Sequence, residues 1–220
     1  MQYVEEGLNL FARSNTLYFN NGNKLYKKTN QRPVELINDE NYIAAKFGEA
    51  WTAVFEVIEK KNENWLDVHA QFYDDKLLVA MPFPTKEIYL FDKLGLIVTH
   101  HFLEEPISAI DINKRTKEII TLSDDGSLLS YYSYENNVLV LVKQLQLKVQ
   151  YTQMCYCHKG ILLVNTSEQK VILCNEETES DWLKFEGKIF DIISLDKPIF
   201  YGMFLGGIYQ LEHDELTEEK

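Results

Sequence analysis

Apolar residues recur along the chain with a period close to two, in short runs separated by clusters of Asn, Asp, Gly, Lys and Glu. This period is typical of β-strands, because successive side chains of a strand point to opposite faces. The pattern therefore predicts a mainly β protein. The predicted strands cover residues 8–11, 16–19, 51–58, 76–81, 87–91, 96–102, 107–112, 118–122, 128–132, 138–142, 161–164, 171–174, 189–193, 199–204 and 207–211.

The segment 42–60 is the stretch whose composition also suits a helix, because it is rich in Ala, Glu and Lys. Between Trp51 and Ile58, however, its residues follow the two-residue alternation of a strand, and a KKNEN turn comes next. We therefore predict a hairpin in this region. A short helical turn at 43–47 is the alternative.

Similar segments recur roughly every forty residues and indicate a repeat architecture. Each has a polar lead, an apolar strand, a turn of four to five residues and a second strand. Further predicted strands lie between these pairs, so each repeat contains about four strands, as in a propeller blade. The segments begin at Asp74, Arg115, His158 and Leu195, and a weaker copy begins at Asn15.

One repeat, 106–134, resembles a blade of the WD-repeat family of β-propellers. Ser123, Asp125 and Gly126 match the family's Ser-x-Asp-Gly turn, and Tyr131 stands near the position usually held by Trp. The Gly-His and Trp-Asp dipeptides of the family are missing. The resemblance implies an all-β, β-propeller-like array. The repeat spacing gives about five short four-stranded or incomplete blades, which are closed, open or arranged in two lobes.

The repeats define the expected domain organisation. Residues 1–211 form a single all-β repeat domain, with possible lobes 1–104 and 105–211, and residues 212–220 form an acidic tail. The chain has 22 basic and 34 acidic side chains, for a net charge of −12, which argues against a generally basic nucleic-acid-binding surface. Three cysteines, an amino terminus without a basic and apolar leader, and the lack of a long apolar run predict a cytoplasmic protein.

No nucleotide-binding or hydrolase motif is present, and we predict a non-enzymatic protein without a cofactor. Cys155, Cys157 and His158 are of residue types that bind zinc, but a four-ligand set with recognisable spacing is missing. Buried thiols are the simpler interpretation. The carboxylate pairs 74–75, 104–105 and 124–125 are expected at turns, where Asp side chains hydrogen-bond to the local backbone.

Two sets of residues combine basic and aromatic side chains, a combination that binds phosphates and stacks on unpaired bases. Edge-strand protection by lysine and packing by tyrosine is the alternative interpretation. Phe83 and Phe204 lie at or beside turns and are candidate anchors for a protein partner. The predicted RNA-binding residues are Lys24, Tyr26, Lys27, Lys28 and Arg32 in the first set, and Lys143, Lys148, Tyr151, Tyr156, His158 and Lys159 in the second.

The leading functional hypothesis is a protein that docks on a large assembly. In overall character the chain is similar to the microsporidian dormancy factors of the ribosome. That resemblance implies a ribosome-associated, hibernation-type role in which the basic and aromatic segments contact ribosomal RNA, and it assigns no residues. The alternative is a WD-repeat-style adaptor that joins proteins without RNA contact. A metal-dependent enzyme that uses Cys155, Cys157 and a histidine is a third, weaker possibility.

Overall fold

The computed structural model describes most of the chain and divides it into two compact units. The described residues are 2–6, 8–13, 16–21, 24–29, 32–37, 42–48, 51–61, 68–80, 83–157, 159–175, 178–187, 189–194, 200–204 and 207–211. Unit 1 comprises residues 1–40 and 151–220, and unit 2 comprises residues 41–150. The lobe boundary expected near residue 104 falls inside a strand of unit 2.

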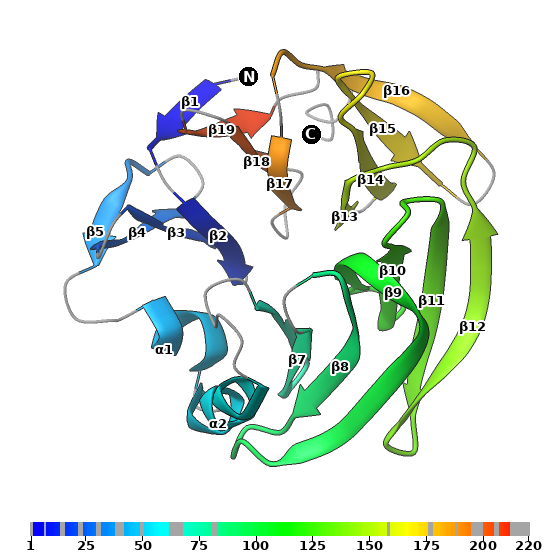
Figure 1. Cartoon of the computed structure of the whole chain (residues 1–220). Coiled ribbons are helices and arrows are strands. Elements are labelled where there is room, and N and C mark those ends of the chain that lie inside the picture. The colour runs from blue at the N-terminus through cyan, green and yellow to red at the C-terminus, as the bar shows by residue number, and fades with distance from the viewer. Residues whose placement is uncertain are drawn as a thin grey trace. The chain divides into compact units, whose positions relative to one another are not determined.

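Where the structure describes unit 1, it forms three four-stranded antiparallel sheets with the orders β2-β3-β4-β5, β13-β14-β15-β16 and β1-β19-β18-β17 (Figure 1). Within the first two, sequence neighbours pair in order, as in a propeller blade. The strands are β1 (Gln2–Glu5), β2 (Leu8–Arg13), β3 (Thr16–Asn21), β4 (Lys24–Thr29), β5 (Glu35–Ile37), β13 (Gln153–Cys157), β14 (Gly160–Asn165), β15 (Lys170–Cys174), β16 (Glu179–Lys184), β17 (Ile189–Ser194), β18 (Phe200–Phe204) and β19 (Gly207–Leu211).

The third sheet of unit 1 joins the two ends of the described chain. Strand β1 pairs antiparallel with β19, and Tyr3 lies opposite Tyr209. The amino-terminal strand thereby completes a sheet whose other three strands come from the carboxyl-terminal part. This pairing spans about two hundred residues of sequence, so it orders both ends together.

Alternating apolar side chains build the interior of unit 1. One core contains residues of the β13–β16 sheet together with residues of β17 and β19. A second contains Leu10, Leu17, Phe19 and Ile208, which come from β2, β3 and β19. Consecutive sheets therefore bury their apolar faces against one another, as blades do.

The described residues of unit 2 form one seven-stranded antiparallel sheet, in the order β12-β11-β10-β9-β8-β7-β6, and two helices (Figure 1). Its elements are α1 (Tyr42–Phe47), α2 (Trp51–Lys61), β6 (His69–Tyr73), β7 (Lys76–Ala80), β8 (Thr85–Phe91), β9 (Ile97–Asn113), β10 (Glu118–Ser123), β11 (Leu128–Glu135) and β12 (Val138–Gln146).

The long strand β9 belongs to two four-stranded arrays. Residues 97–102 pair with β8, and residues 107–113 pair with β10. Side chains from both arrays share one core, in which Leu78, Leu90 and Leu103 meet Ile110 and Ile119. The seven-stranded sheet is thus two blade-like arrays that use one strand, where the sequence predicted two separate strands at 96–102 and 107–112.

The repeat that the sequence predicted is confirmed. Each similar segment forms a hairpin from the two inner strands of one four-stranded array: β3–β4, β7–β8, β10–β11, β14–β15 and β18–β19. The described part of the chain is therefore nearly all β and forms five four-stranded arrays, two of which share β9. The fold class predicted from the sequence holds.

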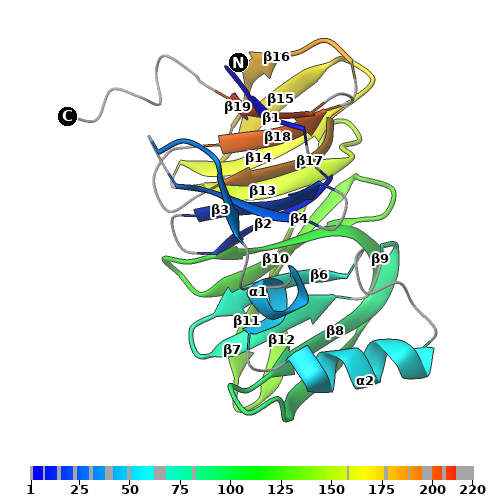
Figure 2. The same cartoon turned by 90° about the vertical axis from the view of Figure 1, so that its left-hand side faces the viewer.

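The hairpin predicted after residue 50 is wrong, because residues 51–61 form helix α2. Val54 and Ile58 are buried, whereas Glu56, Glu59 and Lys60 are exposed, and this spacing is helical. Together with Phe47 of α1, the two apolar side chains pack on Leu77 and Val79 of β7 and on neighbouring residues of β6 and β8. Figure 2 shows both helices beside this array. The alternative of a helical turn at 43–47 agrees with α1.

Among the described residues, no helix combines the length and apolar character that crossing a membrane requires.

Candidate interaction surface

Exposed apolar side chains of the described part of the chain concentrate in unit 2. They lie on the β8–β9 hairpin and on β12, where solvent-exposed aliphatic residues are unusual unless a partner covers them. The exposed large apolar residues at these two places are Leu94, Leu96, Ile97 and Phe102 on the hairpin, and Val138, Val140, Leu141 and Val142 on β12.

Strand β12 lies at the edge of its sheet and, within the residues that the structure describes, pairs only with β11 (Figure 1). Its sequence, VLVLVKQLQ, has one charged residue in nine. A long, apolar strand edge exposes hydrogen-bonding groups that readily pair with another strand, and proteins usually protect such edges with charges, proline or a covering element. β12 has the properties of an edge that accepts a partner.

A groove of about 200 Å³ lies between β9 and the face of β10, β11 and β12. Its floor is polar and includes Thr121, Ser130 and Tyr132, while Gln144 donates a hydrogen bond from Nε2 to Ser130 Oγ at 3.1 Å. Leu141 of the open edge also lines the groove. A pocket that accommodates a cofactor or a drug-sized ligand typically measures about 300–1,000 Å³, so this groove fits a single side chain better.

Phe102 forms one wall of the groove and is held in place although it is 64% exposed. Its ring lies 4.5 Å from that of His100, which stacks on Tyr89 at 4.1 Å. Glu87 fixes both supporting rings, because its Oε2 accepts a hydrogen bond from the Tyr89 hydroxyl at 2.7 Å and lies 3.1 Å from His100 Nε2. The wall is therefore ordered before any partner binds.

Two glutamates, Glu104 and Glu105, form the rim of the groove. They were expected at a turn, and that prediction is wrong, because both lie in β9. Both are exposed, and neither carboxylate has an ion pair within the described part of the chain. The pKa of His101, which also lines the groove, is lowered by burial and by the nearby His100, so its imidazole adds no positive charge at neutral pH.

The turn that carries the WD-repeat resemblance forms one end of the groove. Asp125 accepts hydrogen bonds from the hydroxyls of Ser123 and Ser127, at 2.6 and 2.8 Å, and from the Ser127 amide at 3.0 Å. These bonds lower the pKa of Asp125. Gly126 adopts a φ of 73°, which glycine reaches without strain. The turn holds the β10–β11 hairpin, and Ser123 and Leu128 line the groove.

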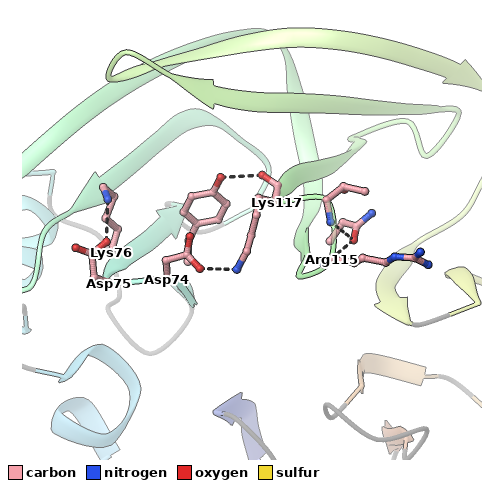
Figure 3. Close-up of polar contacts among 8 residues, drawn as sticks. Asp74, Asp75, Lys76, Arg115 and Lys117 are labelled. Atoms are coloured by element: carbon pink, nitrogen blue, oxygen red, sulfur yellow. Dashed lines mark hydrogen bonds and ion pairs between the residues drawn. The ribbon is translucent and has the colours of Figure 1, made fainter.

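Charged residues at a second place in unit 2 pair with one another (Figure 3). Asp74 accepts a hydrogen bond from the Lys117 ammonium, and Asp75 accepts one from Lys76 at 2.8 Å. The hydrogen bond from Lys76 lowers the pKa of Asp75 and raises that of Lys76. The Arg115 side chain points away from these carboxylates in Figure 3.

The carboxylate pairs Asp74–Asp75 and Asp124–Asp125 lie at turns, as predicted. The ion pair of Asp74 with Lys117 links the β6–β7 turn to the β9–β10 turn.

The first predicted RNA-binding set lies on and after β4. The Tyr26 ring stacks on Phe19 at 5.6 Å and packs against the core of unit 1. Lys27 forms an ion pair with Glu35 at 3.3 Å, and the Lys28 ammonium donates to the main-chain oxygen of Arg32. Lys24 and Arg32 are exposed. These contacts favour the packing interpretation for Tyr26. Lys27 lies on an inner strand that pairs with β3 and β5, so its ion pair stabilises the sheet and does not protect an edge.

The second set is divided between the two units. In unit 2, the Lys143 ammonium lies 4.4 Å from the centre of the Tyr131 ring, and Lys148 is exposed. In unit 1, Tyr151 is 3% exposed, and its hydroxyl donates to Glu179 at 3.0 Å, so its ring is covered. Tyr156 is half-buried, Lys159 is exposed, and His158 lies outside the described residues. RNA binding by either set stays a prediction.

The other predicted site residues have packing roles where the structure describes them. Phe83 is half-buried, packs on the core shared by the two arrays and lies 6.0 Å from the His69 ring. The side chain of Phe204 lies outside the described residues. Cys155, Cys157 and Cys174 are all buried, the first two in the core of unit 1. Among the described residues no group of three or more metal-ligating side chains forms.

Comparisons with known proteins give a likeness of fold. No family model and no curated protein matches the chain. Among solved structures, PorZ, a surface component of the type-IX secretion system of Porphyromonas gingivalis, matches with a TM-score of 0.51 at 7% identity, over 96% of this chain and 34% of that chain.

Two further solved structures are similar at a lower level. The β-propeller domain of Cps50 (Swd1) from Myceliophteria thermophila matches with a TM-score of 0.48 at 9% identity, over 89% of this chain and 65% of that one. BBS1N in complex with ARL6DN matches with a TM-score of 0.48 at 14% identity, over 89% and 60%. The chain spans less than two thirds of the length of these structures.

The groove was not predicted from the sequence. Its wall and floor come from 101–107, 121–132 and 141–144, which the fold brings together by the bend of β9. The sequence of β12 does indicate an unusual surface. Aliphatic residues occupy the consecutive positions 138–142, so this predicted strand has no polar face. Such a strand is either buried on both faces or covered by a partner.

Proposed function

We infer that this protein is a non-enzymatic adaptor that joins proteins. The observation that carries the proposal is the open apolar edge of β12 beside the preformed groove walled by Phe102. An interaction site of this kind has an aromatic anchor, apolar surroundings and a polar rim. The β9–β12 array of unit 2 provides the strands that line it.

The ribosome-associated interpretation has less support. An RNA-binding surface needs exposed cations and exposed rings, whereas Tyr26 and Tyr151 are packed and Lys27 is paired. The exposed groove of unit 2 is acidic at its rim and therefore repels phosphate.

The two interpretations separate in one affinity-purification experiment from native extract. The tagged wild-type chain is compared with a groove variant, Phe102→Asp with Leu141→Asp, and with a charge-reversal variant, Lys24→Glu with Lys27→Glu and Lys28→Glu. We expect the association with partner proteins to persist after nuclease treatment. It should be lost in the groove variant and retained in the charge-reversal variant.

The reverse pattern contradicts the adaptor proposal. If association is lost after nuclease treatment and in the charge-reversal variant, while the groove variant retains it, the protein binds RNA. Co-sedimentation with ribosomes at low salt, measured for the same three proteins, then identifies the ribosome as the assembly or excludes it.

A further inference from the structure

The groove of unit 2 carries information about the chemistry of the partner. Its rim bears the carboxylates of Glu104 and Glu105, which form no ion pair with any residue that the structure describes, and its lining contains no Lys or Arg. Lys86 donates a hydrogen bond from its ammonium to the main-chain oxygen of Glu104, at 2.7 Å, and not to the carboxylate. A cationic side chain is the complement of this rim.

Aromatic rings add a second preference for a cation. Phe102, Tyr132 and His101 line the same groove, and the rings of His101 and Tyr132 lie 5.9 Å apart in an edge-on arrangement. The faces of Phe and Tyr attract Lys and Arg, while the alkyl stem of either side chain packs on apolar surface. Leu141 provides that surface at the groove wall.

The open edge of β12 indicates the conformation of the partner. Leu141 and Gln144 belong to β12 and line the groove, so a strand that pairs with β12 places alternate side chains over the same face. Main-chain hydrogen bonds then provide affinity, and the groove selects one side chain. The exposed Val138, Val140 and Val142 lie on the same edge strand and favour apolar residues in the partner.

We propose that unit 2 binds an extended, apolar segment of a partner protein, which adds to the edge of β12 and inserts one Arg or Lys side chain into the groove between Phe102, Glu104 and Glu105. This inference rests on the proposed adaptor function and specifies the partner of the same site.

A defined peptide probe tests the inference with the full-length chain. The probe is a fluorescently labelled ten-residue peptide of alternating Val and Thr with one central Arg, and versions carry Gln or Glu at that position. Fluorescence polarisation measures binding. We expect saturable binding of the Arg peptide, about tenfold weaker binding of the Gln peptide and still weaker binding of the Glu peptide, because a charge-assisted hydrogen bond contributes about one factor of ten or more.

Matched variants assign the selectivity to the rim. Glu104→Gln with Glu105→Gln removes two charges and is expected to bind the Arg and Gln peptides equally. Glu135→Gln with Glu186→Gln removes two charges elsewhere and is expected to keep the discrimination, because both residues are exposed and neither lines the groove. A peptide whose alternate amides are N-methylated along one edge is expected to lose binding, because it lacks the donors for pairing with β12.

Each opposite result overturns the inference. It fails if the Arg peptide does not bind, if wild-type protein binds the Arg and Gln peptides equally, or if the groove pair and the control pair of variants behave alike. It also fails if the wild-type chain associates with a second copy through β12, detected by light scattering. If the peptides fail while the groove variant still loses its partners in the extract experiment, the adaptor function stands and only the partner chemistry is wrong.

Discussion

Strands β12 and β16 occupy the same position in two four-stranded arrays but differ in how their surfaces are used. Each is the outermost strand, and each has one inserted residue where its register with the preceding strand shifts. In β16 that residue is Trp182, which is 5% exposed and packs in the core of unit 1. In β12 it is Val142, which is 53% exposed.

The two edges are also protected differently. The charged residues of β16 are Glu179, Asp181 and Lys184. Two of them make contacts within unit 1: Glu179 accepts a hydrogen bond from Tyr151, and Asp181 forms an ion pair with Lys170 at 3.4 Å. Charges of this kind prevent unwanted strand pairing. β12 has Lys143 alone. One edge therefore contributes contacts to the fold, whereas the other keeps an exposed apolar surface, which the proposed adaptor function assigns to a partner.

Replacing the inserted residue tests this difference most strongly. Trp182→Ala is expected to lower the free energy of unfolding by about 3–5 kcal/mol, because it removes a large buried side chain. Val142→Ala, at the matched position, is expected to change it by less than about 0.5 kcal/mol. Urea unfolding followed by circular dichroism measures both. Equal losses would show that Val142 is also a core residue.

Acidification is expected to weaken unit 2 through His69. Burial, and secondarily Lys46, lower the pKa of His69 to about 3, and its Nε2 has no hydrogen-bond partner among the described residues. Its folded-state pKa lies below the unfolded value of about 6.5, so stability is complete above that value and is lost as the pH falls toward 3. We expect a loss of about 1–2 kcal/mol between pH 7 and pH 5.

Hydrogen exchange of β6–β8 amides at the two pH values measures this loss. His69→Gln is expected to flatten the dependence in β6–β8, while β14–β16 of unit 1 serve as the internal reference. An unchanged slope in the variant would assign the acid sensitivity to another group.

The turn before β11 is expected to contribute less to the free energy of unfolding than Trp182 does. Asp125→Ala removes three hydrogen bonds that hold the β10–β11 hairpin, and we expect a loss of about 1–2 kcal/mol. The corresponding change before β15, Asn165→Ala, removes the acceptor of the Glu168 amide and is expected to cost about 1 kcal/mol. Thermal unfolding compares the two. No loss in Asp125→Ala would exclude the turn as the element that holds the groove.

Charging the β12 edge is expected to have the smallest effect on stability. Val140→Lys with Val142→Lys should change the free energy of unfolding by less than about 0.5 kcal/mol, because both residues are exposed. The same variant should abolish partner binding, since the lysines protect the edge as the charges of β16 do. Calorimetry and the extract experiment are the measurements. A large loss of stability would show that the edge is covered within the chain.

Local patterns were sufficient for the repeat and for most strands. The hairpin segments that begin at Asp74 and Arg115 were recognised because each strand alternates and each turn has polar residues. Helix α2 was missed because Trp51, Ala53, Phe55 and Val57 also alternate, and a short window fits both periods. The buried side of α2, with Val54 and Ile58, became identifiable only against the β6–β8 array.

Alternation of apolar residues and turn chemistry are properties of neighbouring residues, so the sequence specified an all-β repeat fold and the turn at 123–126. Other features depend on residues that are distant in the chain. The pairing of β1 with β19, the bend of β9 and the groove beside Phe102 arise when arrays pack together. For the same reason, the burial of Tyr151 and the exposure of Val142 were decided by packing, because residues of similar hydrophobicity on strands become core or surface according to what covers them.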